Sequence, residues 1–353
     1  MHVRNYGHRR RSIPSRFPGL PYAFGVSITH LLVGNATAQS GKNQGRIDRA
    51  RAYLERASVP CDFLPTEPLG KTTAAVARAI ESNAYQCVIA MGGDGTFREV
   101  AAGILDSSRK DDVALGMLPT GTANDQGRSF GLDAGDASLE RNLEVILAAK
   151  ETRLDAGRLD EHIWFFDSVG WGLSARVLRE RNAEREVVAH VPLLRDVYRD
   201  QLVYASSLLR VFLDSYVVPD KFDVEVTADG KTFQLEGLSD LVVKGTRVYG
   251  GAWVFDRKAV HDDGLFEIVP FHGKRDWASK AIVDLDANPI SEEMLAAVGI
   301  EHSKVMSASR IVLDFRRWEG GAVWAAQIDG EELAATERVS IEVVQKALRL
   351  IVP

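Results

Sequence analysis

The sequence predicts an α/β plus β fold, in which a parallel α/β domain precedes an antiparallel β-sandwich. From Ser27 to about residue 120, short apolar runs alternate with segments of helical periodicity. After about Asp155, apolar residues recur instead at every second position. A chain of 353 residues is also long for one hydrophobic core, so two domains are expected.

The N-terminal half alternates predicted strands and amphipathic helices. The strands are the apolar runs SITHLLV, CDFL, CVIAM and VALGML. The helices between them carry apolar residues at helical spacing: Ile47, Ala50, Leu54 and Ala57, then Ala75, Val76, Ala79 and Ile80, then Phe97, Val100, Ala101, Ile104 and Leu105. Strands that are apolar throughout indicate a parallel sheet covered on both faces, a Rossmann-like arrangement. Such sheets bind ligands at the carboxyl ends of their strands.

The C-terminal half reads as an antiparallel sandwich. Its predicted strands are KFDVEVT and KTFQLEG, joined by the hairpin dipeptide Asp229-Gly230, followed by LFEIV, RIVLDF, VWAAQI and VSIEVV. The segment 193–213 is expected to be a helix that packs on the core. The predicted organisation is a loose basic tail over 1–26, an α/β domain over 27–153 and a sandwich over 154–353. Whether the last strand returns to the first domain is left open.

The composition excludes several classes of protein. With a formal charge of -6, the chain has no overall attraction to nucleic acid, and nucleic acid is not expected as a partner. Cys61 and Cys87 lie inside apolar stretches and are expected as buried, free thiols. The chain has neither a secretory apolar segment nor an apolar run of about 18 residues, which indicates a cytoplasmic protein. The basic tail leaves contact with anionic lipid open.

The first glycine turn, GGDGT, follows the strand CVIAM. Gly92, Gly93 and Gly95 allow the backbone to approach a ligand closely, and a helix starts near Thr96 with its N–H groups aimed at the same place. Such a turn favours phosphate. Asp94 would repel an anion there unless a cation such as Mg²⁺ bridges the two, so the turn indicates a nucleotide with a metal ion. Simple helix capping is the alternative for one such turn alone.

A second polar glycine turn, LPTGTANDQGRSFGL, follows the next strand. Gly121, Thr122, Asn124 and Asp125 should lie on the same edge of the sheet as the first turn. Hydroxyl, amide and backbone donors there can hold a phosphate or a ribose, and Arg128 offers a bidentate guanidinium. Two such turns on adjacent strands favour a ligand site over two unrelated caps.

These motifs, in this order, resemble a known family. GGDGTFREV, followed about 25 residues later by LPTGTAND, is similar to the catalytic domain of diacylglycerol kinases and related lipid kinases, including sphingosine and ceramide kinases. HLLVGNATAQSGKNQG resembles the opening strand and loop of that family, and TRLDAGRL with WFFDSVGWGLSA resembles its link into the second domain. VYGGAWVFDRKAVHDDGLFEIV resembles the stretch that ends in Asp-Asp-Gly, and AAQIDGEEL resembles its Asp-Gly-Glu motif.

The resemblance implies ATP in a cleft between the two domains, with Mg²⁺ as the metal. By position, Glu331 would be the general base for a lipid hydroxyl, and Asp94 would act on Mg²⁺. The residues implied to bind the nucleotide are Asn35, Thr72, Gly92, Gly93, Gly95, Thr96, Gly121, Thr122 and Asn124. Asp262 and Asp263 would help to hold a structural Mg²⁺, with a plain surface turn as the alternative. The implied partners are a membrane lipid reached by transient docking, which would make the protein peripheral at the membrane, and a second copy of the chain, because family members are often dimers.

Three departures from the family pattern bear on the acceptor. NATAQSGK lacks a proline, so Asn35, Ser40 and Lys42 all remain candidates for phosphate contact. NDQGRSFGL has Gln126 and Gly127 in place of an aromatic residue and alanine, and VVKGTRVYGG has a lysine in place of an asparagine. The expected function is phosphorylation of diacylglycerol or a related glycerolipid. An NAD kinase-like enzyme and a catalytically silent nucleotide- or lipid-binding regulator are the alternatives.

Overall fold

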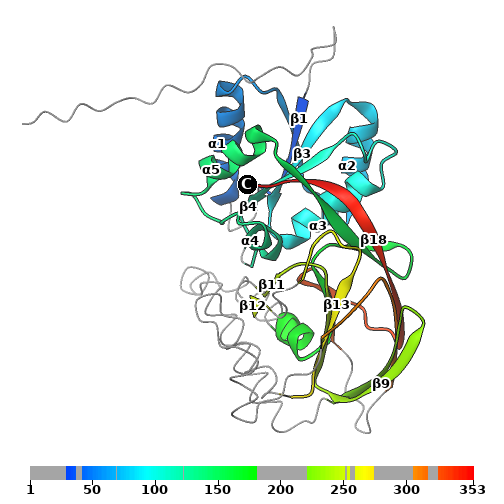
Figure 1. The fold of residues 1–353 in the computed structure, drawn as a ribbon. Coiled ribbons are helices and arrows are strands. Elements are labelled where there is room, and N and C mark those ends of the chain that lie inside the picture. The colour runs from blue at the N-terminus through cyan, green and yellow to red at the C-terminus, as the bar shows by residue number, and fades with distance from the viewer. Residues whose placement is uncertain are drawn as a thin grey trace, which may run out of the picture.

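The computed structural model describes residues 29–36, 42–68, 70–121, 123–180, 221–250, 253–254, 259–273, 305–316 and 325–353. The basic tail, Thr122 and the helix expected at 193–213 lie outside the described residues. The described chain forms two halves, a helix-rich upper one and a strand-rich lower one (Figure 1).

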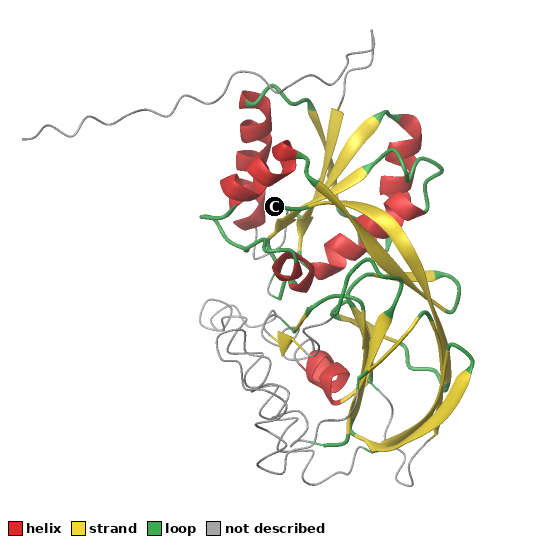
Figure 2. Cartoon of the chain, viewed as in Figure 1, coloured by secondary structure: helices red, strands yellow, loops and turns green. Residues whose placement is uncertain are grey.

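The upper half is a parallel sheet with helices on both faces (Figures 1 and 2). Its elements are β1 (Thr29–Gly34), α1 (Lys42–Arg56), β2 (Cys61–Pro65), α2 (Lys71–Ser82), β3 (Tyr85–Gly92), α3 (Asp94–Leu105), β4 (Ala114–Pro119), α4 (Asp125–Ser129) and α5 (Leu139–Ala148). The strands run in the order β2-β1-β3-β4, and each neighbouring pair is parallel. The predicted Rossmann-like fold is therefore confirmed.

Burial on both faces explains why these strands are apolar throughout. In β1, Leu31 and Val33 pack into one cluster with Phe97 of α3, whereas Leu32, between them, packs with Ile47 of α1 in another cluster. Successive side chains of a strand point to opposite faces, so both faces require an apolar residue. α2 and α3 cover the first face, and α1 and α5 cover the second.

The described residues of the lower half are mainly in strands. The strands are β5 (Glu151–Leu159), β6 (Ile163–Phe165), β7 (Ser168–Gly172), β8 (Phe222–Ala228), β9 (Lys231–Leu238), β10 (Asp240–Lys244), β11 (Val248–Tyr249), β12 (Trp253–Val254), β13 (Phe266–Phe271), β14 (Met306–Ala308), β15 (Arg310–Arg316), β16 (Ala326–Ile328), β17 (Glu331–Leu333) and β18 (Arg338–Ile351). Residues 173–180, after β7, are helical. A six-stranded sheet of order β14-β13-β10-β7-β16-β17 packs against the second sheet through a core that includes Trp171, Phe266 and Leu313. The predicted antiparallel sandwich is confirmed.

One sheet runs through both halves. Its order is β2-β1-β3-β4-β18-β15-β8-β9, with β5 and β6 attached beside β18, which makes ten strands. The 14-residue strand β18 pairs antiparallel with β15 at Ile341 and parallel with β4 at Arg349. Figure 1 shows it curving upward from the lower half to a C-terminus beside β4.

Several local predictions can be compared with the structure. Asp229 and Gly230 have φ of 45° and 80° and close the two-residue hairpin between β8 and β9, as expected for a type I′ turn. Both cysteines are free; Cys87 is buried, but Cys61 is half-buried. None of the described helices combines the length and apolar character needed to cross a membrane.

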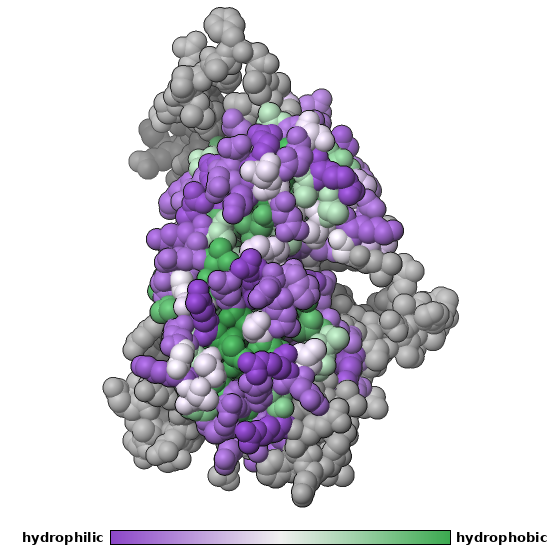
Figure 3. Space-filling model, turned by 90° about the vertical axis from the view of Figure 1, so that its right-hand side faces the viewer, coloured by the Kyte–Doolittle hydropathy of each residue, from purple (hydrophilic) through white to green (hydrophobic). Residues whose placement is uncertain are grey.

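The surface of the described part is mainly polar. In Figure 3 hydrophilic side chains dominate the upper half, and hydrophobic ones gather in the middle and lower parts. Among the large hydrophobic residues that the structure describes, however, only Val260 is exposed, with 41% of its surface accessible. Side chains such as Phe233, Leu235 and Val343 are partly buried against the core of the sandwich.

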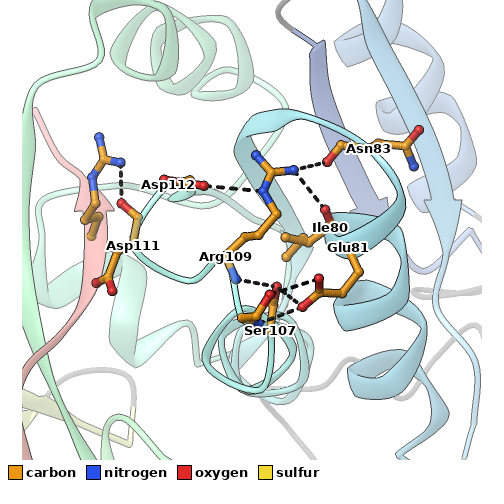
Figure 4. Close-up of polar contacts among 9 residues, drawn as sticks. Ile80, Glu81, Asn83, Ser107, Arg109, Asp111 and Asp112 are labelled. Carbon is orange, nitrogen blue, oxygen red and sulfur yellow. Dashed lines mark hydrogen bonds and ion pairs between the residues drawn. The ribbon is translucent and has the colours of Figure 1, made fainter.

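A polar cluster closes the edge of the parallel sheet at which α2 and α3 end (Figure 4). Arg109 Nη1 donates to the carbonyl oxygens of Ile80 at 3.1 Å and Asn83 at 2.5 Å. Glu81 accepts a hydrogen bond of 2.6 Å from the backbone N–H of Ser108. Carbonyl groups at a helix end have no partner within the helix, so the cluster caps α2 and fastens it to the turn after α3.

Candidate active site

The two predicted glycine turns meet at the opposite edge, where β3 and β4 end. The N–H of Thr120 donates to the carbonyl oxygen of Gly92 at 2.8 Å. A Cβ atom added to Gly93 would lie 3.2 Å from the Cα of Gly121, and one added to Gly121 would collide with the Cα of Gly93. The backbones of the two turns therefore touch, and a larger residue would push them apart. The predicted meeting of these turns on one edge is seen in the structure.

Asn124 shapes the second turn from within. Its Oδ1 accepts a hydrogen bond from the N–H of Gly121, and its Nδ2 donates to the carbonyl oxygen of Gly121, both at 2.8 Å. The residue is 2% exposed and adopts φ of 55°, in the left-handed region that asparagine tolerates. Sequence reasoning assigned Asn124 to the nucleotide, but in the structure its amide is bonded to the turn itself.

Asp94 belongs to the first glycine turn and is the first residue of α3. Its Oδ1 accepts a hydrogen bond of 3.2 Å from the backbone N–H of Gln126. Loss of hydration raises the pKa of Asp94 to about 7, and the negative charge of Asp167 adds to the increase. A carboxyl group held so unfavourably as an anion is suited to a bound cation, which would restore the charged form.

A second buried carboxyl group, that of Asp167, lies near Asp94. Asp167 is 2% exposed; its carboxylate accepts hydrogen bonds from the hydroxyls of Ser168, at 3.0 Å, and Thr246. Burial raises the pKa of Asp167, whereas those hydrogen bonds and the charge of Lys244 oppose the increase. Lys244 is fully buried and donates to the carbonyl oxygen of Arg247 at 2.7 Å. Sequence reasoning did not select Asp167, whose only local sign is an aspartate between two apolar runs.

Asp329 anchors the turn that carries Glu331. Its carboxylate accepts hydrogen bonds from the backbone N–H groups of Phe166, Asp167 and Ser168 at 2.9, 2.8 and 3.0 Å. Burial nevertheless raises the pKa of Asp329 to about 7, with a further contribution from the charge of Asp167. Asp329 therefore fixes the β16–β17 turn to the strand β7.

Glu331, on β17, reaches the glycine turn from the six-stranded sheet. A Cβ atom added to Gly95 would collide with its Oε1, so this oxygen lies directly against the start of α3. Its Oε2 forms an ion pair with Nη2 of Arg98. The predicted base and the predicted phosphate turn, more than 230 residues apart in the chain, are thus side by side.

Other predicted residues have partners within the protein. Thr72 is fully buried; its hydroxyl donates to the carbonyl oxygen of Glu67 and accepts from the N–H of Glu67, both at 3.0 Å. Asn35 follows β1 and accepts a hydrogen bond of 2.7 Å through its carbonyl oxygen from Nδ2 of Asn43. The side chain of Thr96 fills the space beside Gly92. Ser40 of the opening loop lies outside the described residues.

Asp262 and Asp263 lie near β5 and β18, beside the buried Asp155. Asp263 Oδ1 accepts from the N–H of Leu265 at 3.0 Å, and Asp262 Oδ2 is 4.0 Å from Lys346 Nζ. Burial raises the pKa of Asp155, and the charges of Asp263 and Asp262 add to the increase. Within the described part of the chain, no group of three or more His, Cys, Asp or Glu side chains has the geometry of a metal site. The structural Mg²⁺ expected at Asp262 and Asp263 stays a prediction.

Comparison with known proteins supports the family expected from the motifs. Residues 29–159 match the family model "Diacylglycerol kinase catalytic domain". The family resemblance is thereby confirmed for this segment. A diacylglycerol kinase of Staphylococcus saprophyticus is 35% identical over 121 residues, which are 34% of this chain and 38% of the relative. One of Staphylococcus aureus is 32% identical over 137 residues, which are 38% of this chain and 42% of the relative.

The matched sequence spans about two fifths of these relatives. The segment that matches the family model, residues 29–159, contains Asn35, Thr72 and both glycine turns, but Glu331, Asp262 and Asp263 lie beyond it. A crystal structure of a diacylglycerol kinase from Bacillus anthracis str. Sterne superimposes with a TM-score of 0.66 over 92% of this chain and 97% of that one. At 20% identity, this similarity extends to the fold of both halves.

Proposed function

We propose that this protein is an ATP- and Mg²⁺-dependent lipid kinase that transfers the γ-phosphate to a hydroxyl of diacylglycerol or a related glycerolipid. The observation that carries the proposal is the contact between Glu331 and the turn at Gly95. Phosphoryl transfer needs a phosphate cradle and a carboxylate beside it that can take the proton of the acceptor. The family match over residues 29–159 and the names of the curated relatives support the same chemistry.

In the proposed reaction, each part of the site has a separate task. The backbone N–H groups around Gly93 and Gly121, with the N-terminus of α3, would hold the phosphates of ATP. Asp94 would hold Mg²⁺, which, when bound, offsets charge on the phosphate oxygens. Glu331 would accept the proton of the lipid hydroxyl. The hydroxyl oxygen of the lipid would bond to the γ-phosphorus as the bond to ADP breaks and ADP leaves. Asp329 and Asn124 would keep the base and the second turn in position.

The proposed acceptor is a lipid alcohol. A lipid hydroxyl must come to the site from a membrane, so we propose transient docking of the protein on the lipid surface. The names of the relatives favour diacylglycerol. The buried Lys244, next to Asp167, stands where the family has an asparagine, so the preference among related glycerolipids needs to be measured directly.

The test is phosphoryl transfer from radiolabelled ATP, with Mg²⁺, to vesicles that contain diacylglycerol, phosphatidylglycerol, ceramide or sphingosine. NAD serves as a soluble acceptor. Glu331→Gln and Asp94→Asn are each expected to lower kcat on the order of 10² to 10⁴-fold. Glu332→Gln, on the other face of β17, and Asp106→Asn, at the far end of α3, are matched controls expected to retain activity.

Transfer to diacylglycerol that is lost in both site variants and kept in both controls would support the proposal. Transfer to NAD alone would replace it with an NAD kinase-like activity. No transfer to any acceptor, with ATP still bound, would favour a silent nucleotide-binding regulator.

A further inference from the structure

Arg98 contacts the proposed base directly. It lies on α3, one helical turn after Asp94, and its Nη2 pairs with Oε2 of Glu331. The side chain of Arg98 is 19% exposed, whereas that of Glu331 is 48% exposed. The guanidinium therefore approaches the carboxylate from the protein side, and solvent has access from the other side.

The two oxygens of Glu331 have different surroundings. Oε2 is taken by Arg98, while Oε1 lies against Gly95 at the start of the helix. A carboxylate on a flexible side chain could otherwise rotate freely. With Oε2 held, the oxygen that faces the phosphate turn is Oε1.

Negative charge around Glu331 makes a cationic partner necessary. Glu99, next to Arg98 on α3, and Asp329, on the same turn as Glu331, are both near enough to Arg98 for its charge to lower their pKa values. Burial and the charge of Glu331 act in the opposite direction on Glu99 and raise its pKa. The negative charges of Glu99 and Glu331 repel each other. Arg98 opposes that repulsion.

We propose that Arg98 is a positioning residue for phosphoryl transfer: it holds Oε2 of Glu331 so that Oε1 faces the phosphate turn and receives the proton of the acceptor hydroxyl. This inference rests on the proposed function, because it assigns Arg98 a role only through Glu331. It makes Arg98 important for the rate of the chemical step rather than for the binding of ATP.

The experiment compares Arg98→Gln, Arg98→Lys, Glu331→Gln and the double variant Arg98→Gln/Glu331→Gln in the vesicle assay. Arg98→Gln is expected to lower kcat on the order of 10²-fold, because a misplaced catalytic group loses about that much, with the KM for ATP unchanged. Arg98→Lys should recover part of the rate, because it keeps the charge without the planar guanidinium. A half-exposed ion pair adds little stability, so the melting temperature should hardly change.

The double variant is decisive. If Arg98 acts through Glu331, the double variant should be no slower than Glu331→Gln alone. Arg141→Gln, which removes an exposed arginine of α5 whose ion pair spans 3.9 Å, is the matched control and should keep full activity.

Two results would overturn the inference alone: unchanged kcat in Arg98→Gln while Glu331→Gln is inactive, or losses that multiply in the double variant. Multiplying losses together with a lowered melting temperature would mean that the ion pair only ties α3 to the six-stranded sheet. If Glu331→Gln itself kept full activity, the proposed base and this inference would fall together.

Discussion

The two edges of the parallel sheet treat acidic side chains in opposite ways. At the edge where α3 begins, burial and the charge of Asp167 raise the pKa of Asp94 to about 7. At the edge reached by the end of α2, hydrogen bonds from Ser108 and Ser107 lower the pKa of Glu81. At the first edge, the hydrogen bonds to Asp94 do not offset the effect of its burial. At the second edge, hydrogen bonds from serine stabilise the ionised form of Glu81. The contrast separates the edge proposed to bind a charged ligand from an edge whose hydrogen bonds hold two helices together.

Among the substitutions that compare the two edges, the largest effect is expected for Gly121→Ala. Its methyl group would collide with the Cα of Gly93 and lie 2.9 Å from Oδ1 of Asn124, so the two turns must separate. Since backbone atoms cannot move aside as a side chain can, we expect kcat/KM for ATP to fall on the order of 10²-fold. Steady-state kinetics would test this, and near-normal kcat/KM would show that the turns tolerate separation.

Arg109→Ala should affect the other edge. The variant loses hydrogen bonds to the carbonyl oxygens of Ile80 and Asn83, and we expect the free energy of unfolding to fall by about 1 to 2 kcal/mol. Urea denaturation would measure this, with kcat expected to stay unchanged. Arg141→Ala is the control with an exposed ion pair and should be nearly neutral. A loss of activity in Arg109→Ala at full stability would contradict the division between the edges.

The pH dependence of stability should differ in sign between the two edges. Because folding raises the pKa of Asp94 from 3.8 to about 7, the folded state binds the proton more tightly, and this contribution to stability falls as pH rises from about 4 to 7. Asp94→Asn should reduce that fall. Folding lowers the pKa of Glu81 from 4.5, so its contribution is present at neutral pH and is lost as pH falls below 4.5.

Glu81→Gln should accordingly reduce the loss of stability in acid. Chemical denaturation of both variants and the unmodified protein at pH values from 3 to 8 would measure the two slopes. If the contributions of Asp94 and Glu81 to the free energy of unfolding changed with pH in the same direction, the distinction between the edges would be wrong.

The smallest effect is expected for Gly45→Ala, in the exposed part of α1. A Cβ atom at Gly45 would meet nothing within 4 Å, so alanine should raise the free energy of unfolding by about 0.5 to 1 kcal/mol through helix propensity. Differential scanning calorimetry would detect the higher melting temperature. Its activity should match that of the unmodified protein, in contrast with alanine at Gly121.

Local patterns were sufficient to predict most of the fold and the framework of the site. The apolar runs with helical segments between them predicted the parallel sheet, and the glycines after β3 and β4 predicted the edge where the turns meet. Asp167 was missed because its importance comes from Asp94 and Thr246, which are distant in sequence. Thr72 and Asn124 were identified by position, but only the folded chain reveals their own hydrogen-bond partners.

The path of β18 has a consequence for any attempt to divide the chain. Leu348 and Leu350 belong to the core between the sheet and α2 and α3, and Ile351 belongs to the core on the other face. The segment 29–159, which matches the kinase family, is therefore completed by the last residues of the chain. Expressed alone, it would expose the edge of β4 and the apolar side chains that pack against Leu348, Leu350 and Ile351. The family match is continuous in sequence, but the folding unit that contains it also requires β18.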